Sequence, residues 1–154
     1  MANTKEFDFI KLFYDIRNVC LTEDHCKFCK GDACLVGFAR LAIGEAKQKD
    51  TDTLPGKFSK IPAYDINGSY DQQDTMEAIA HTLQQCRSCR TQHTEDCLVN
   101  IVRSCYEVIL MGDHRDFEGS TLMYLTELAK EYPKYASYIA DVYQSHDNPM
   151  DETL

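Results

Sequence analysis

The most regular feature of the chain is a pattern of apolar residues at helical spacing. In residues 6–19 these side chains recur three or four positions apart, which predicts an amphipathic helix. Its apolar stripe consists of Phe9, Ile10, Phe13, Ile16 and Val19. No segment alternates apolar and polar residues for long enough to predict a sheet. The pattern therefore predicts an all-α protein.

Residues that favour helix starts locate two further helices. Asp32 can cap a helix that runs to about Lys47. Asp74 with Glu77 resembles a capping box, which opens another helix towards the second CxxC pair of the chain. The apolar positions of the helix after Asp32 are Leu35, Phe38, and Leu41 or Ala42.

The C-terminal half contains more signals of this kind. Thr94 is a candidate cap for a helix that Gly112 stops. Ser120 begins another helix, and Pro133 breaks or kinks it. The apolar sets are Leu98, Ile101, Val102, Cys105 and Ile109 before Gly112, and Tyr135, Tyr138, Ile139 and Val142 after Pro133. We therefore expect a bundle of about five or six helices with two cysteine-bearing turns.

A different kind of segment, residues 50–73, lies between the two halves and is called the crossover segment below. Its turn residues are interleaved with the apolar side chains of Phe58, Ile61, Tyr64, Ile66 and Tyr70. An unstructured linker would carry fewer aromatic residues, so we expect a long ordered crossover that packs on the bundle. We expect a single domain over residues 1–145 and a frayed acidic tail over residues 146–154.

The composition limits the classes of partner. The 154 residues include 16 Lys and Arg against 25 Asp and Glu, a formal net charge of -9. This excess of acidic over basic residues disfavours binding to nucleic acid or to an anionic membrane. The charged N-terminal segment lacks the apolar run of a signal peptide, and no stretch has the roughly 18 apolar residues of a membrane helix. We expect a cytoplasmic protein whose partner, if it has one, is another protein.

Eight cysteines stand out in this composition. The first cysteine group is Cys20, Cys26, Cys29 and Cys34, and the second cysteine group is Cys86, Cys89, Cys97 and Cys105. In a reducing compartment such cysteines bind metal or carry out redox chemistry more often than they form structural disulfides.

The two groups lie in similar sequences. HCKFCKGDACLVGFAR and QCRSCRTQHTEDCLVNIVR both read Cys-basic-x-Cys-basic, a spacer, then Cys-Leu-Val-x-x-x-Arg. The spacer has four residues in the first copy and seven in the second. We interpret residues 25–47 and 85–111 as a degenerate internal repeat, with one cysteine-bearing turn and one helix per copy.

This arrangement favours metal binding. Each CxxC pair can hold one ion through two thiolates, and the third cysteine, Cys34 or Cys97, follows in the first turn of a helix, where the dipole favours the thiolate. The candidates for the fourth ligand are Cys20 or His25 in the first copy and His93 or Cys105 in the second. A shared site would instead use Cys26, Cys29, Cys86 and Cys89. The expected ligands are Cys20, Cys26, Cys29, Cys34, Cys86, Cys89, His93 and Cys97.

Zinc and iron–sulfur clusters use the same types of ligand, and the spacing favours zinc. Cluster-binding runs usually show tighter C-x2-C-x2-C spacing followed by Cys-Pro, and neither copy has it. A fully ligated ion would be structural. We therefore expect an adaptor or regulatory protein in preference to an enzyme.

A second hypothesis is thiol redox catalysis. The stretch Cys86-Arg-Ser-Cys89-Arg-Thr-Gln-His93 resembles the CxxCxxxH motif of the alkylhydroperoxidase D-like, carboxymuconolactone decarboxylase family. The resemblance, which spans residues 77–93, implies an all-helical thiol peroxidase or oxidoreductase. By it, Cys89 attacks peroxide, Cys86 is the resolving thiol, and His93 with Glu77 relays protons.

Simpler interpretations apply to several polar residues and to the cysteines themselves. Glu77 and His81 lie one helical turn apart, a spacing that is more often a solvated contact than a metal site. Arg40 and Arg103 end the matching segments and are expected to form salt bridges within the bundle. Eight inert core thiols are the remaining alternative, but a core does not explain basic residues beside each CxxC pair.

Overall fold

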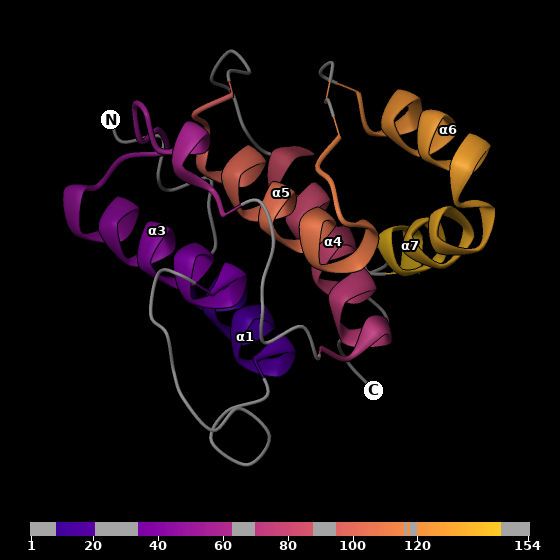
Figure 1. Ribbon diagram of the computed structural model, residues 1–154, viewed down its shortest axis with the longest axis horizontal. Helices are drawn as coiled ribbons and strands as arrows, with labels where there is room; N and C mark the ends of the chain where they lie inside the picture. The colour runs from indigo at the N-terminus through magenta and orange to yellow at the C-terminus, as the bar shows by residue number, and fades with distance from the viewer. Residues whose placement is uncertain are drawn as a thin grey trace.

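A computed structural model describes residues 9–20, 34–62, 70–87, 95–115, 117 and 120–145. Within these ranges the chain forms six α-helices and no strand, which confirms the predicted helical bundle (Figure 1). The helices are α1 (Phe9–Val19), α3 (Leu35–Lys49), α4 (Gln72–Arg87), α5 (Leu98–Met111), α6 (Thr121–Glu131) and α7 (Pro133–Ser145), and a short 3-10 helix, η3, spans Phe58–Lys60. None of the helices so described is long and apolar enough to cross a membrane.

Four helices form the centre of the bundle. Both α1 and α5 pack against α3 and α4. Phe9, at the start of α1, packs on Cys97 and Val99 at the start of α5. Thr53, just after α3, pairs with Cys97 through an isolated bridge. Consequently α1 and α5 begin at the end of the bundle where α3 finishes, so both run antiparallel to α3.

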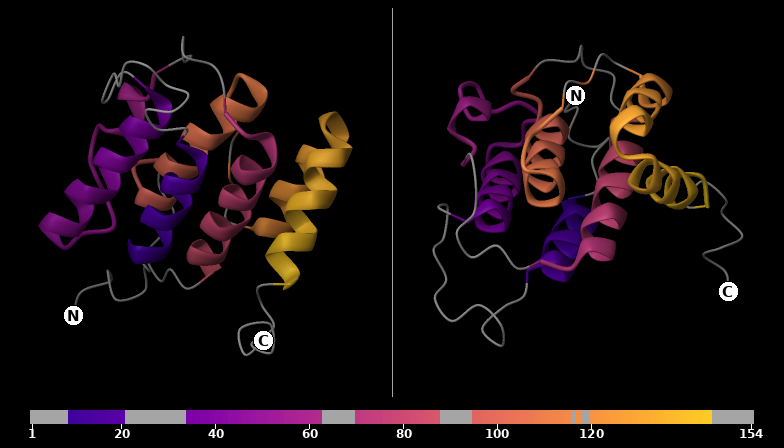
Figure 2. Two further views of the ribbon diagram at one scale, coloured as in Figure 1. Left: turned by 90° about the horizontal axis from the view of Figure 1, so that it is seen from below. Right: turned by 45° about the vertical axis from the view of Figure 1, so that its right-hand side comes forward.

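The remaining two helices form an outer layer. Helix α7 packs on α4 and on α6, and Figure 2 shows α6 and α7 on the side of α4 that faces away from α3. The central helix is α5, which is buried at every position from Leu98 to Val108. The core is therefore concentrated on α5, and polar residues within that span must find partners inside the protein.

The predicted apolar stripes are correct in part. Ile16 and Val19 of α1 are buried, but Ile10 is 79% exposed and Leu12 takes its place in the core. In α3 the alternative between Leu41 and Ala42 is decided in favour of Ala42, because Leu41 is half exposed. Two positions along a helix correspond to a rotation of about 200° about the helix axis, so Ile10 and Leu12 face different sides. A residue that the sequence assigns to the edge of an apolar stripe can therefore face solvent.

Three predicted helix boundaries are confirmed. The Ser120 side chain accepts a hydrogen bond from the Met123 amide at 3.2 Å, which caps α6. Gly112 ends α5 with a left-handed φ of 85°, a conformation that glycine adopts without steric cost. Helix α6 stops before Pro133, which begins α7.

One predicted cap is wrong. Helix α4 starts at Gln72 and is capped by Asp71, whose carboxylate accepts from the Asp74 amide at 2.8 Å, so Asp74 and Glu77 form no capping box. The N-cap residues of α3 and α5 are Cys34 and Cys97. The caps predicted for these two helices, Asp32 and Thr94, lie outside the described residues.

The crossover segment is ordered where it is described. Leu54 is buried, and Phe58, Ile61 and Tyr70 pack against the core, which confirms the expected packing on the bundle. Residues 63–69 of this segment and the predicted tail, residues 146–154, lie outside the described residues. The described parts of the crossover segment, after α3 and before α4, therefore pack on the bundle.

A cluster of ion pairs on the surface makes the stability of the protein depend on pH. Glu45 of α3 lies 2.8 Å from the Lys49 Nζ and 2.9 Å from the Lys57 Nζ. Hydrogen bonds from these two lysines lower the pKa of Glu45 from 4.5 to about 2. Because this folded-state pKa is depressed, the cluster stabilises the protein above pH 4.5, and that contribution is lost as the pH falls towards 2.

We expect Glu45→Gln to flatten the acid side of the stability profile over this pH range, with a loss below about 1 kcal/mol at neutral pH. Urea denaturation followed by circular dichroism at a series of pH values measures this. High salt should reduce the difference between the two proteins, because it screens an exposed pair. Parallel profiles of wild type and variant between pH 5 and pH 2 would contradict the prediction.

Candidate functional site

The described part of the first cysteine group centres on Cys34. Cys34 is the N-cap residue of α3 in an extended conformation, with φ -97° and ψ 141°. Its carbonyl accepts the first helical hydrogen bond from the Phe38 amide at 2.7 Å. Its Sγ lies 3.1 Å from the hydroxyl of Tyr70, which comes from the far end of the crossover segment. The thiol thus sits at the positive end of the α3 dipole, beside a hydroxyl group.

Cys97 occupies the same position at the start of α5. It is the N-cap residue, is extended with φ -63° and ψ 137°, and is 6% exposed. Thr53 pairs with it through the isolated bridge, and the Leu98 amide donates to the Asp52 carbonyl at 2.8 Å. These contacts tie the start of α5 to the beginning of the crossover segment.

Asp96 strengthens this connection. Its carbonyl accepts from the Leu54 amide at 2.9 Å. Its carboxylate accepts from the amides of Gly56 at 3.0 Å and Phe58 at 3.2 Å. A carboxylate that accepts two backbone amides fixes a turn firmly. The crossover segment therefore contacts the third cysteine of both groups, Cys97 near its start and Cys34 near its end.

Cysteine is an unusual residue at a helix N-cap. Ser, Thr, Asp or Asn usually stands there, because the side-chain oxygen accepts from a backbone amide of the first turn. The Sγ atoms of Cys34 and Cys97 make no such bond with the first turns of α3 and α5, all of which are described. The two thiols thus occupy matching positions at the starts of two helices.

The two third cysteines lie at different ends of the bundle. The residues that follow α3 meet the start of α5, where Thr53 pairs with Cys97. Cys34 stands at the other end of α3, and the 15 residues of this helix rise about 22 Å along its axis. The described helix ends that flank the two CxxC pairs are thus separated by most of the length of the bundle.

Cys105 belongs to the second cysteine group and lies in the second half of α5. It is fully buried. Burial raises the pKa of the Cys105 thiol, and the charges of Glu107 and Cys34 raise it further. A neutral thiol is a poor metal ligand, so this environment favours a core role for Cys105 over a role as fourth ligand.

Most of the other predicted ligands cannot be placed on the structure. His25, Cys26, Cys29, Cys89 and His93 lie outside the described residues. Cys20 follows the end of α1 and is half buried against the core. Cys86 is in the last turn of α4, where only the backbone is described. Among the side chains that are described, no three from His, Cys, Asp and Glu converge to hold a metal. The ligand set stays a prediction.

Glu77, the proton relay of the redox resemblance, lies on α4, nine residues before Cys86 in the same helix. Its carboxylate accepts from the Tyr138 hydroxyl of α7 at 2.7 Å. Glu77 thus joins α4 to α7.

His81 is a buried residue and not one half of a solvated pair with Glu77. Its Nδ1 lies 2.8 Å from Asp15 Oδ1 of α1, and both side chains are more than nine-tenths buried. The charge of Asp15 also acts on the buried Tyr106 of α5. The pair connects the first two-helix unit, α1 with α3, to the second, α4 with α5. No local pattern in the sequence indicates this contact.

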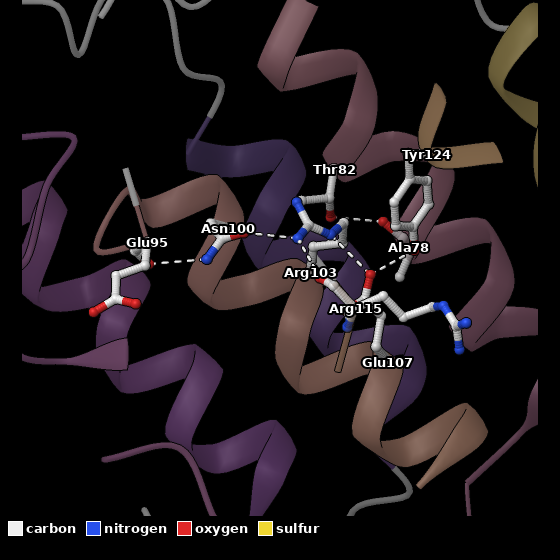
Figure 3. Close-up of polar contacts among 8 residues, drawn as sticks. All are labelled: Ala78, Thr82, Glu95, Asn100, Arg103, Glu107, Arg115 and Tyr124. Atoms are coloured by element: carbon white, nitrogen blue, oxygen red, sulfur yellow. Dashed lines mark hydrogen bonds and ion pairs between the residues drawn. The ribbon is translucent and has the colours of Figure 1, made fainter. Parts of the chain in front are cut away.

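The largest polar network surrounds Arg103 in the centre of α5 (Figure 3). The Arg103 Nε donates to Glu107 Oε2 at 2.8 Å, which confirms the predicted salt bridge. Both side chains are fully buried. Arg103 Nη2 also donates to Asn100 Oδ1 at 2.6 Å. Arg103 and Glu107 are four residues apart on an otherwise apolar helix, a spacing from which the sequence can indicate such a pair. Arg40, the matching residue of the first copy, is exposed.

The same network holds the segment that leads to α6. The other Glu107 oxygen accepts from the Arg115 amide at 2.8 Å, and Glu107 Oε2 accepts from the Tyr124 hydroxyl. The Arg103 guanidinium lies over the rings of Phe117 and Tyr124, 5.0 Å and 5.2 Å from their centroids. Because Arg103 and Glu107 have no contact with solvent, their network is a structural element that joins α5 to α6.

No protein-family model, curated protein or solved structure matches the chain.

Proposed function

We propose that the protein binds metal through its two cysteine groups, with zinc preferred over an iron–sulfur cluster. The observation that supports this most strongly is the matched position of Cys34 and Cys97. Each is the N-cap residue of a helix, and each is contacted by the crossover segment. A helix N-terminus stabilises the thiolate, the form of cysteine that binds metal.

The proposal has two separate sites. The first would use Cys26, Cys29 and Cys34 with Cys20 or His25, and the second Cys86, Cys89, His93 and Cys97. Cys34 and Cys97 lie at opposite ends of α3, whose length of about 22 Å favours two sites over one shared site. In each half a helix, a CxxC pair, a cysteine N-cap and a second helix follow in order. This order supports the proposed duplication.

A fully ligated zinc ion has no open coordination position and is structural. The proposed role is therefore that of a small cytoplasmic adaptor or regulatory module with a protein partner, since reduced thiols are needed to bind the metal. Zinc would hold each cysteine-bearing turn against the bundle, and the core around α5 would support both turns.

Metal analysis tests the proposal. Protein purified without oxygen is expected to contain two equivalents of zinc per chain; iron with sulfide would indicate clusters. Cys34→Ser and Cys97→Ser are each expected to lose one equivalent, because each removes one ligand from a different site. Cys105→Ala is the matched control and should keep both equivalents.

Other outcomes would contradict the proposal. Metal-free protein whose thiols react rapidly with peroxide would support the redox hypothesis instead. Metal-free protein with slow, uniform thiol reactivity would identify the cysteines as core residues.

A further inference from the structure

Tyr70 is held in place by the packing of its ring against the core and by the helix that follows it. The ring is half buried and packs against the core. The next residue, Asp71, caps α4 by accepting from the Asp74 amide at 2.8 Å, and its carbonyl accepts from the Thr75 amide at 3.1 Å. The backbone of Tyr70 is thus fixed by the helix that follows it. Its hydroxyl is positioned 3.1 Å from Cys34 Sγ by packing and not by chance contact of two surface groups.

The direction of this hydrogen bond follows from the state of the sulfur. With a neutral thiol, either group can donate. When Cys34 binds metal, its proton leaves to solvent and the thiolate can only accept. The Tyr70 hydroxyl must then be the donor. Hydrogen bonds to a ligand atom orient it and tune the metal, and their removal typically weakens metal binding about 10–100-fold.

We infer that Tyr70 is a positioning residue of the first metal site: its hydroxyl donates to the Cys34 thiolate, orients that ligand, and closes the site with the end of the crossover segment. The inference rests on the proposed metal-binding function. It assigns the crossover segment a role in metal retention at the Cys34 end, in addition to joining the two halves of the bundle.

Tyr70→Phe tests the inference because it removes one oxygen and keeps the ring. We expect one of the two zinc equivalents to be lost to a chromophoric chelator at about tenfold lower chelator concentration, and the other to be unchanged. In the cobalt-substituted protein, the thiolate-to-cobalt charge-transfer band should move to lower energy for one site. If the resident group is an iron–sulfur cluster, the substitution should lower the reduction potential of one cluster.

Tyr135→Phe is the matched control. Tyr135 is also half buried against the core, and its hydroxyl accepts from Gln72 Nε2 at 2.7 Å, also near the start of α4. It does not contact a cysteine among the hydrogen bonds of the described residues. This variant should match wild type in both chelator competition and cobalt spectrum.

The possible results separate the two proposals. Wild type with two equivalents and an unchanged Tyr70→Phe protein would overturn the role of Tyr70 and leave the metal-binding function standing. Wild type without metal would overturn both. Equal effects of the two substitutions, or a loss of helicity in metal-free Tyr70→Phe beyond that in Tyr135→Phe, would assign Tyr70 a purely structural role and overturn the inference.

Discussion

Replacing Glu107 with glutamine is expected to lower the free energy of unfolding by about 3–5 kcal/mol, because it leaves a buried guanidinium without its counter-charge. The Glu107 carboxylate accepts from Arg103 Nε and from the Arg115 amide, both at 2.8 Å, and from the Tyr124 hydroxyl. Neither Arg103 nor Glu107 has contact with solvent. An amide has the shape of the carboxylate but carries an NH2 group, which would face donors in this network.

Urea denaturation followed by circular dichroism measures the loss, which corresponds to a fall in Tm of about 6–20 °C for a chain of this size. Glu127→Gln is the control: Glu127 pairs with Lys130 at 3.1 Å on exposed α6 positions, and its loss should be within about 0.5 kcal/mol. The double variant Arg103→Met/Glu107→Leu should recover much of the stability, because no charge remains buried. Equal effects of Glu107→Gln and Glu127→Gln would refute the argument.

The second large effect is expected for the pair of Asp15 and His81, which joins the two halves of the bundle. His81→Leu is expected to cost about 3 kcal/mol, because it leaves the Asp15 carboxylate buried without the imidazole. The two side chains meet at 2.8 Å and are 7% and 4% exposed. Since α1 contributes Asp15 and α4 contributes His81, the contact fixes one half against the other.

A double-mutant cycle with Asp15→Leu measures the coupling energy between the two residues. We expect the double variant to be more stable than His81→Leu alone, because the unsatisfied carboxylate is then absent. Glu77→Gln is the control on the same helix: Glu77 is half buried, and glutamine can still accept from Tyr138. Additive effects of Asp15→Leu and His81→Leu would contradict the prediction. In the redox hypothesis, by contrast, Glu77→Gln would slow thiol turnover.

Local signals in the sequence predicted the helices well. Ser120 and Gly112 act through bonds and dihedral angles within a few residues of themselves, so a sequence pattern is sufficient to locate them. Pro133 acts in the same way through its ring. The capping box at Asp74 failed because Asp71, three residues earlier, competes for the same amide. Propensity alone does not decide between two adequate caps.

The candidate site was predicted less completely, for a related reason. CxxC spacing and the position of Cys34 and Cys97 before a Leu-Val pair are local features, and both cysteines do stand at helix starts. The contact of Cys34 with Tyr70 joins residues that are 36 positions apart in the chain. A single sequence carries no record of which distant residues become neighbours.

The sequence by itself determined the helical class, most helix boundaries and the two cysteine groups, because period, caps and spacing act over a few residues. The tertiary structure alone decided that the third cysteines lie at opposite ends of α3, that Cys34 meets Tyr70, and that Asp15 meets His81. These contacts arise from the antiparallel packing of whole helices around α5. That packing is selected because it buries the apolar surface of all the helices together, and no single segment determines it.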